Sequence, residues 1–215
     1  MIKKVKDPLS ALSHFIGVIL SLFAVVSLVQ KANQTGSLLH VLAFGIFGFS
    51  LVLLYSASTI YHIIEKPEWL SNTLQRIDHM MIFVLIAGTY TPICLIPLGG
   101  TLGLTILSII WSIAILGILF KIFWMNAPRW IYTGVYIAMG WLIVLAIFPL
   151  IRALSAKAIG WLLAGGISYT LGAILYGAKW PKLKSKHFGF HEIFHLFVLL
   201  GSFCHFILIY RYISI

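Results

Sequence analysis

Charged residues are scarce in this sequence: Asp, Glu, Lys and Arg together make up 9% of its 215 residues. Hydrophobic residues make up 61%. Soluble domains of this size do not have such a composition, whereas integral membrane proteins do. The formal net charge of +10 does not indicate a nucleic-acid partner, because the basic residues lie in short loops between apolar runs, where they orient helices.

Cysteine is scarce too, and the sequence shows no low-complexity tail and no clear internal repeat. Cys94 and Cys204 fall inside apolar runs, so they predict neither a disulfide framework nor a CxxC site. The basic N-terminus followed by an apolar run resembles a signal peptide. That run is too long for a signal peptide and no small-residue cleavage pattern closes it, so we expect a retained first span.

Long hydrophobic runs are abundant. Each run has about the 20 residues that a helix needs to cross a bilayer, whereas spanning β-strands would be shorter and would alternate. The seven runs are 9–29, 38–64, 77–97, 102–120, 130–150, 158–178 and 188–210. The sequence therefore predicts an all-α integral membrane protein in which residues 1–215 form a single bundle of seven transmembrane helices.

Lysine and arginine are distributed unevenly between alternate loops. With the N-terminus inside the cell, the inside segments hold Lys3, Lys4, Lys6, Lys66, Arg76, Lys121, Arg129, Lys179, Lys182, Lys184 and Lys186. The outside segments hold only Lys31, Arg152, Lys157 and Arg211. Because basic residues favour cytoplasmic loops, we expect a cytoplasmic N-terminus and a C-terminus outside.

The last apolar run carries the motif H-E-x-x-H, from His191 to His195. On a helix these two histidines are four residues apart, so their rings project from one face and form half of a metal site. Ionisable groups are costly inside a membrane and usually functional there. An alternative is that the two histidines only hydrogen-bond neighbouring helices.

Three further polar side chains are expected at the same depth. His62 lies at the cytoplasmic end of the second run, and Ser58, four residues earlier, shares its helix face. Asp78 lies at the cytoplasmic end of the third run. The sequence therefore predicts that these side chains and the H-E-x-x-H histidines converge just below the cytoplasmic interface.

The chemistry of this set suits a zinc ion. The expected ligands are His62, His191 and His195. Three neutral imidazoles with an open fourth position are typical of catalytic zinc rather than of closed structural sites. Asp78 could accept a proton from water or orient a ligand histidine, and Ser58 could hydrogen-bond the water or a substrate carbonyl.

Two other ionisable residues stay open at this point. Glu192 occupies the position of the general base in H-E-x-x-H peptidases, but on a helix it projects about 100° away from His191. It could therefore face lipid headgroups or water instead. His14, near the cytoplasmic end of the first run, could approach the site or serve in helix packing.

The motifs in this order resemble the hemolysin III family, the bacterial branch of the progestin and adipoQ receptor (PAQR) superfamily. The resemblance covers essentially the whole chain and rests on the segments STIYH, DHMMIFVLIAGTYTP and FGFHEIFHLFVLLGSFCHF. It implies a seven-helix protein of the bacterial plasma membrane with a zinc ion near the inner leaflet. It places the family's serine, first histidine and aspartate on Ser58, His62 and Asp78, and its two seventh-helix histidines on His191 and His195.

The wider group resembles alkaline ceramidases, which are zinc-dependent lipid amidases. We therefore expect a zinc-dependent hydrolase that acts on a membrane lipid amide or ester at the cytoplasmic side. Two alternatives stay open: a sensor or receptor with a structural zinc, and a cytolytic protein. A pore would show polar residues along its full depth, whereas polarity here stops at the inner side. The sequence does not identify protein partners.

Overall fold

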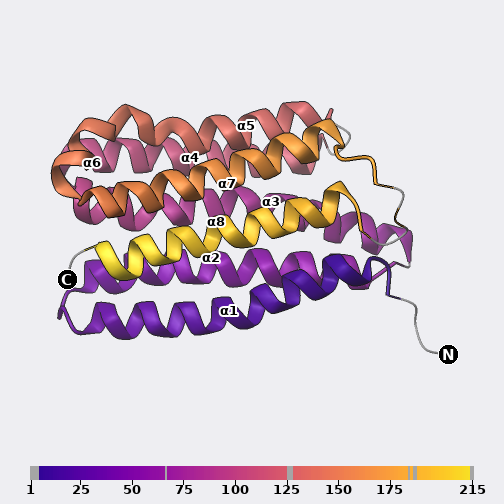
Figure 1. The fold of residues 1–215 in the computed structure, drawn as a ribbon, viewed down its shortest axis with the longest axis horizontal. Helices are drawn as coiled ribbons and strands as arrows, with labels where there is room; N and C mark the ends of the chain where they lie inside the picture. Colours follow the sequence, from indigo (N-terminus) through magenta and orange to yellow (C-terminus); the bar gives the residue numbers. More distant parts are fainter. Residues whose placement is uncertain (1–4, 66, 125–127, 184, 186–187, 214–215) are drawn as a thin grey trace.

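The computed structural model describes residues 5–65, 67–124, 128–183, 185 and 188–213. In these ranges all of the regular secondary structure is helical, and short loops connect the helices. Seven helical segments are long and apolar enough to cross a bilayer, which confirms the predicted all-α, multi-pass class (Figure 1). The spans are α1 (Pro8–Asn33), α2 (Leu38–Ile63), α3 (Glu68–Ile93) with the π-helical turn η1 (Cys94–Leu98), α4 (Gly100–Phe123), α5 (Arg129–Trp141) with the 3₁₀ segment η2 (Leu142–Ala146) and α6 (Ile147–Ala153), α7 (Ala156–Ala178), and α8 (Phe190–Tyr212).

The third span begins earlier than its apolar run. Helix α3 begins at Glu68, whereas the run begins at residue 77. The additional turns have the sequence EWLSNTLQR and contain several good helix formers. Pro67 comes directly before them, and proline is tolerated at the start of a helix but not in its interior. Hydropathy detects only the part of a helix that matches the hydrocarbon layer, so these polar turns were not predicted.

The α-helix of the fifth span is interrupted where the Tyr90 side chain of α3 bonds to its backbone groups. The Tyr90 hydroxyl donates to the Met139 carbonyl at 2.7 Å and accepts from the Ile143 amide at 2.8 Å, so it separates a pair that would otherwise bond directly. Pro149, further along, has no amide hydrogen to offer the carbonyl of residue 145. Both effects fall on η2, and they explain why this span changes from α-helix to 3₁₀-helix there.

Helices α2, α3 and α8 have the largest buried shares among the spans. Helix α1 packs against α2 and α8, and α7 packs against α8. The α2–α3 contact is close because Gly88 faces Ser50, where any side chain would overlap the serine. The histidines and the aspartate expected at the site therefore lie on the three helices that are best shielded from lipid.

The outer surface of the bundle is apolar. Phe23, Phe123, Leu145 and Phe148 are at least 70% exposed, as expected for side chains in contact with lipid tails. The beginning of α1 and the end of α8 lie at opposite ends of the bundle, which an odd number of spans requires (Figure 1). Which end faces the cytoplasm remains a prediction from the basic residues. Lys3, Lys4, Lys66, Lys184 and Lys186 from that set lie outside the described residues.

Candidate metal centre

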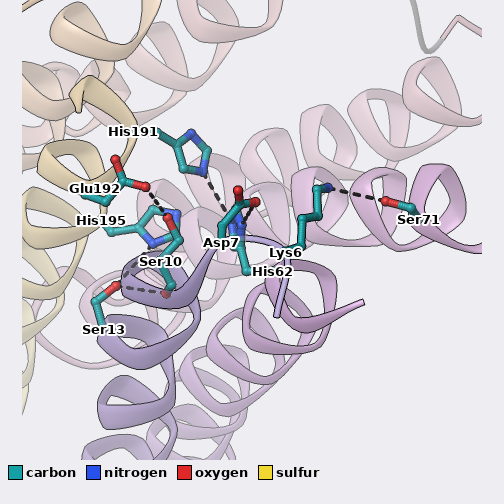
Figure 2. A network of polar contacts seen from close by, with 9 residues as sticks. All are labelled: Lys6, Asp7, Ser10, Ser13, His62, Ser71, His191, Glu192 and His195. Atoms are coloured by element: carbon teal, nitrogen blue, oxygen red, sulfur yellow. Dashed lines mark hydrogen bonds and ion pairs between the residues drawn. The ribbon is translucent and has the colours of Figure 1, made fainter. Parts of the chain in front are cut away.

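Three imidazoles converge where the end of α2 meets the beginning of α8. His62, His191 and His195 can each offer a ring nitrogen such that the three atoms lie within 4.8 Å of one another. Nε2 of His62 and Nε2 of His191 are 3.2 Å apart (Figure 2). Two nitrogens bound about 2.0–2.1 Å from a tetrahedral zinc ion lie about 3.3 Å from each other, so the spacing and the donor set fit such an ion. The structure thus brings together the predicted ligands at a site that could hold a metal.

Asp7 orients the first of these ligands, and the sequence did not predict this contact. Nδ1 of His62 donates to Oδ2 of Asp7 at 2.9 Å (Figure 2). This hydrogen bond lowers the pKa of the Asp7 carboxyl from its usual value, with burial opposing the shift, so the group is charged at neutral pH. With Nδ1 occupied, Nε2 of His62 is the nitrogen left for a metal.

The position of Asp7 explains why it was overlooked. It precedes Pro8 at the N-terminus of α1, where an aspartate followed by proline is typical of a helix start. Its carboxylate makes no capping bond to α1 and bonds His62 instead. A D-P pair before the first apolar run predicts a cap, but no local pattern reveals a partner 55 residues away.

Helix α1 also supports His195. Nδ1 of His195 lies 3.3 Å from Oγ of Ser13, and its ring stacks on His14 at 3.6 Å between centroids. The role of His14 was left open by the sequence, and the structure places it beside the metal centre. The stack and the serine fix the orientation of the His195 ring, which favours metal binding through Nε2. A fourth helix therefore contributes to the site.

Ser58 and Asp78 lie beside the histidines. Ser58 is 1% exposed and Asp78 is 7% exposed, and both line a small cavity together with His191 and His195. The Ser58 hydroxyl is a neighbour of the Asp78 carboxylate. The cavity has a volume of ≈ 30 Å³, which is enough for a water molecule with polar partners on several sides. The four polar residues named here come from α2, α3 and α8, the helices that the sequence expected to converge, and residues of α1, α5 and α7 complete the lining.

Glu192 has structural partners on both carboxylate oxygens. Oε2 accepts the Gly189 amide hydrogen at 2.8 Å, which closes the first turn of α8. Oε1 accepts a hydrogen bond from Oγ of Ser10 at 2.6 Å, which ties α8 to α1 (Figure 2). These bonds give Glu192 an anchoring role and hold the helix turn that carries His191.

A second, larger cavity continues from the small one into the bundle. It has a volume of ≈ 130 Å³ and is lined mostly by aliphatic and aromatic side chains. Six residues line both cavities: Leu54, Ile82, Tyr136, Ala173, Phe194 and Val198. An apolar space therefore adjoins the candidate metal centre on the side away from the helix ends.

We expect Asp7→Ala to weaken zinc binding by about 10–100-fold, the usual effect of removing a partner that orients a metal-binding histidine. The side chain of Asp7 is 41% exposed, so its removal should leave the bundle folded. Zinc affinity is measured in detergent by competition with a chelator. Glu68→Ala, which removes an exposed acid at the start of α3, serves as the control. Equal affinity in Asp7→Ala and the wild type would contradict this role.

A family comparison and two curated relatives all relate this chain to bacterial hemolysin-3 proteins. The family described as "Haemolysin-III related" matches residues 2–206. The chain is 46% identical to the "Hemolysin-3 homolog" of Bacillus subtilis (strain 168), over 90% of this chain and 87% of that protein. It is 45% identical to "Hemolysin-3" of Bacillus cereus, over 94% and 90% of the two chains.

A more distant relative supports the resemblance to the PAQR superfamily. The chain is 22% identical to the "Adiponectin receptor protein" of Drosophila melanogaster, over 90% of this chain and 48% of the receptor. The match to the family extends over nearly the whole sequence and includes the segments that carry Ser58, His62, Asp78, His191 and His195. The chain therefore belongs to the haemolysin-III-related family of membrane proteins.

Proposed function

We propose that the protein is a zinc-dependent hydrolase that cleaves an amide or ester bond of a membrane lipid at the cytoplasmic side of the membrane. The observation that carries this proposal is a buried three-histidine cluster, two members of which line a water-sized cavity together with Asp78 and Ser58. A closed structural site would need four protein ligands, whereas this cluster offers three.

The residues of the small cavity have the functions that hydrolysis requires. A zinc ion at the three histidines would polarise the scissile carbonyl and make water a better nucleophile. Asp78 accepts the proton that the attacking water releases and passes it to the leaving group. Ser58 donates a hydrogen bond to the carbonyl oxygen or holds the water. The buried surroundings exclude other water from the reaction.

The larger cavity supports a lipid as the substrate. Its lining is apolar and it begins where the small cavity ends, so an acyl chain would fill it while the bond to be cleaved lies at the histidines. A polar, soluble substrate would gain nothing from this space. With the orientation expected from the basic residues, the lipid reaches the site from the inner leaflet.

We expect the purified, zinc-loaded protein to release a fatty acid from at least one lipid of a panel of ceramides and glycerolipids, measured by mass spectrometry. Removing the metal with a chelator should abolish the release, and adding zinc back should restore it. Glu68→Ala, which changes an exposed residue in the first turn of α3, should behave as the wild type. Failure of folded, zinc-loaded protein to release a fatty acid from any lipid of the panel would refute the proposed activity.

A further inference from the structure

Arg129 lies at the beginning of α5, close to the histidine cluster. Its guanidinium carbon lies over the ring of Tyr176, 4.6 Å from the centroid, and 5.7 Å from the centroid of Phe190. The Tyr176 ring is 5.5 Å from the ring of His191, one of the candidate ligands, and it lines the small cavity. The same tyrosine therefore contacts both the guanidinium and the candidate metal centre.

The guanidinium of Arg129 has donors that the protein does not use. In the described part of the chain it forms no hydrogen bond and no ion pair. Nη1 is sealed inside the protein, whereas Nε and Nη2 are not, and the residue as a whole is partly exposed. Aromatic rings attract the cation through their π-faces but offer no acceptor to its in-plane N–H groups. A partly buried charge without a counterion is costly, so this position favours an anion from outside the chain.

A second basic side chain belongs to the same region. Nζ of Lys121, in the last turn of α4, lies 3.5 Å from the centroid of Tyr132, whose side chain is a neighbour of Tyr176. Lys121 is 1% exposed and, among the described residues, pairs with no carboxylate. It is sealed from any ligand, but its charge adds to the positive potential around Arg129. The end of α4 and the beginning of α5 thus hold two basic groups without a described counterion.

We propose that Arg129 is a specificity-determining residue that binds the phosphate of an anionic phospholipid, so that phospholipids of net negative charge are the preferred substrates of the proposed hydrolase. This inference rests on the proposed function in placing the bond to be cleaved at the histidine cluster. A guanidinium presents its N–H groups as a planar fork that fits the oxygens of a phosphate. Anionic lipids occur in the cytoplasmic leaflet, which this end of the bundle is expected to face.

The distances suit one lipid that occupies both places. The guanidinium and the ring of His191 are 4.6 and 5.5 Å from the same Tyr176 ring. In a phospholipid the phosphate and the nearest acyl ester are carried on neighbouring carbons of one glycerol. A phosphate at Arg129 therefore leaves the ester within reach of the small cavity, and the acyl chain continues into the larger one. A neutral lipid would fill the same cavities and leave the guanidinium unpaired.

A charge that only orients the helices is a weaker explanation for Arg129. Lys179 and Lys182, in the connection between α7 and α8, suit that role as exposed side chains. Arg129 instead packs over two aromatic rings with one nitrogen sealed. Membrane topology requires a positive charge in a loop, but it does not require a guanidinium held in place beside the site.

The test is a binding experiment on the zinc-loaded full chain in detergent, with lipids that it cannot hydrolyse. The probes are a dialkyl-ether phosphatidylglycerol and the dialkylglycerol with the same chains and no phosphate, compared at equal mole fraction in the micelles. Wild-type protein should bind the phospholipid about ten- to a hundredfold more tightly, the contribution of hydrogen bonds to a charged group. Affinities are measured by displacement of a fluorescent phosphatidylglycerol. Displacement by inorganic phosphate as effective as that by the ether phospholipid would indicate a site for a free anion and overturn the proposal.

Arg129→Gln removes the charge and the fork, so it should lose most of the preference for the phospholipid while keeping its zinc. Lys182→Gln removes an exposed positive charge from the α7–α8 connection, at a residue that lines neither cavity, and should keep the preference. Equal binding of the two ether lipids by wild-type protein would overturn the proposal, and it requires no variant that folds. A preference that persists in zinc-loaded Arg129→Gln would overturn it as well, because the phosphate would then bind elsewhere, for example at the metal.

The readout separates this inference from the proposed function, because binding is measured without turnover. A protein that prefers the ether phospholipid through Arg129 but hydrolyses no lipid would refute the hydrolase and keep Arg129 as a phospholipid-binding residue. An active hydrolase that binds both ether lipids equally would refute the role of Arg129 alone.

Discussion

Asp78→Asn should lower lipid turnover by roughly 10²–10⁴-fold, the usual contribution of a general base, while the fold and the bound zinc survive. Asparagine keeps the shape of the aspartate and cannot accept the proton from water. Asp78 is buried beside Ser58 and lines the small cavity with His191 and His195. The substitution should therefore change the rate of the reaction in this cavity and leave the protein surface unaltered. Initial rates of fatty-acid release, zinc content and melting temperature are measured on the same preparation.

Glu192→Gln is the matched comparison for this experiment. Glu192 is the other acid within a span near the site, but its oxygens are bonded to Gly189 and Ser10. We therefore expect a much smaller loss of turnover from Glu192→Gln than from Asp78→Asn. Wild-type turnover in zinc-loaded Asp78→Asn would rule out Asp78 as the base. A fall in zinc content and melting temperature, in a protein without lipid turnover, would instead favour a structural metal and a sensor or receptor function.

His191→Ala should remove most of the bound zinc from a protein that otherwise carries about one ion per chain, since it takes away one of the three convergent nitrogens. Replacing all three histidines should remove the metal entirely. A ligand that binds only the folded state raises its stability according to its concentration and dissociation constant. Added zinc should therefore raise the melting temperature of the wild type and have no effect on the triple variant.

Metal content is measured by elemental analysis of protein purified in detergent. His40→Ala, which changes a histidine at the other end of α2, serves as the control and should keep its zinc. Full zinc retention in the triple variant would show that the metal binds elsewhere. It would also remove the basis for the proposed hydrolysis at this site.

The number of spans and the convergence of the histidines could be predicted from the sequence because both follow from local periodicity. About 20 apolar residues define a span, and side chains four residues apart share a helix face. Successive spans cross the membrane in opposite directions, so the end of the second span and the beginning of the last lie at the same depth. The prediction therefore put His62 and His191 in one layer. Asp78 was assigned to the same layer by the same reasoning, and it lines the cavity beside the ligands.

The contacts of Asp7 and Ser13 could not be predicted in this way, although the sequence did suggest that His14 of the first run could approach the site. Asp7 and Ser13 carry no signal that distinguishes a ligand partner from a helix cap or a packing serine. Their contacts with His62 and His195 depend on how α1 packs against α2 and α8. This packing is set by the tertiary structure and not by a local sequence pattern. The polar first turns of α3 were missed for a different reason, because they form a regular helix outside the hydrocarbon layer.

The distribution of the candidate metal ligands along the chain has a consequence for biosynthesis. His62 and His191 are separated by 129 positions, and the residues that contact the two imidazoles of His62 and His195 lie in α1 or immediately before it. Because α8 supplies two of the three nitrogens, a nascent chain that lacks its last span has no complete site. Metal binding at these histidines would therefore require insertion of the chain through α8, and its free energy would be linked to the packing of α1 and α2 against α8.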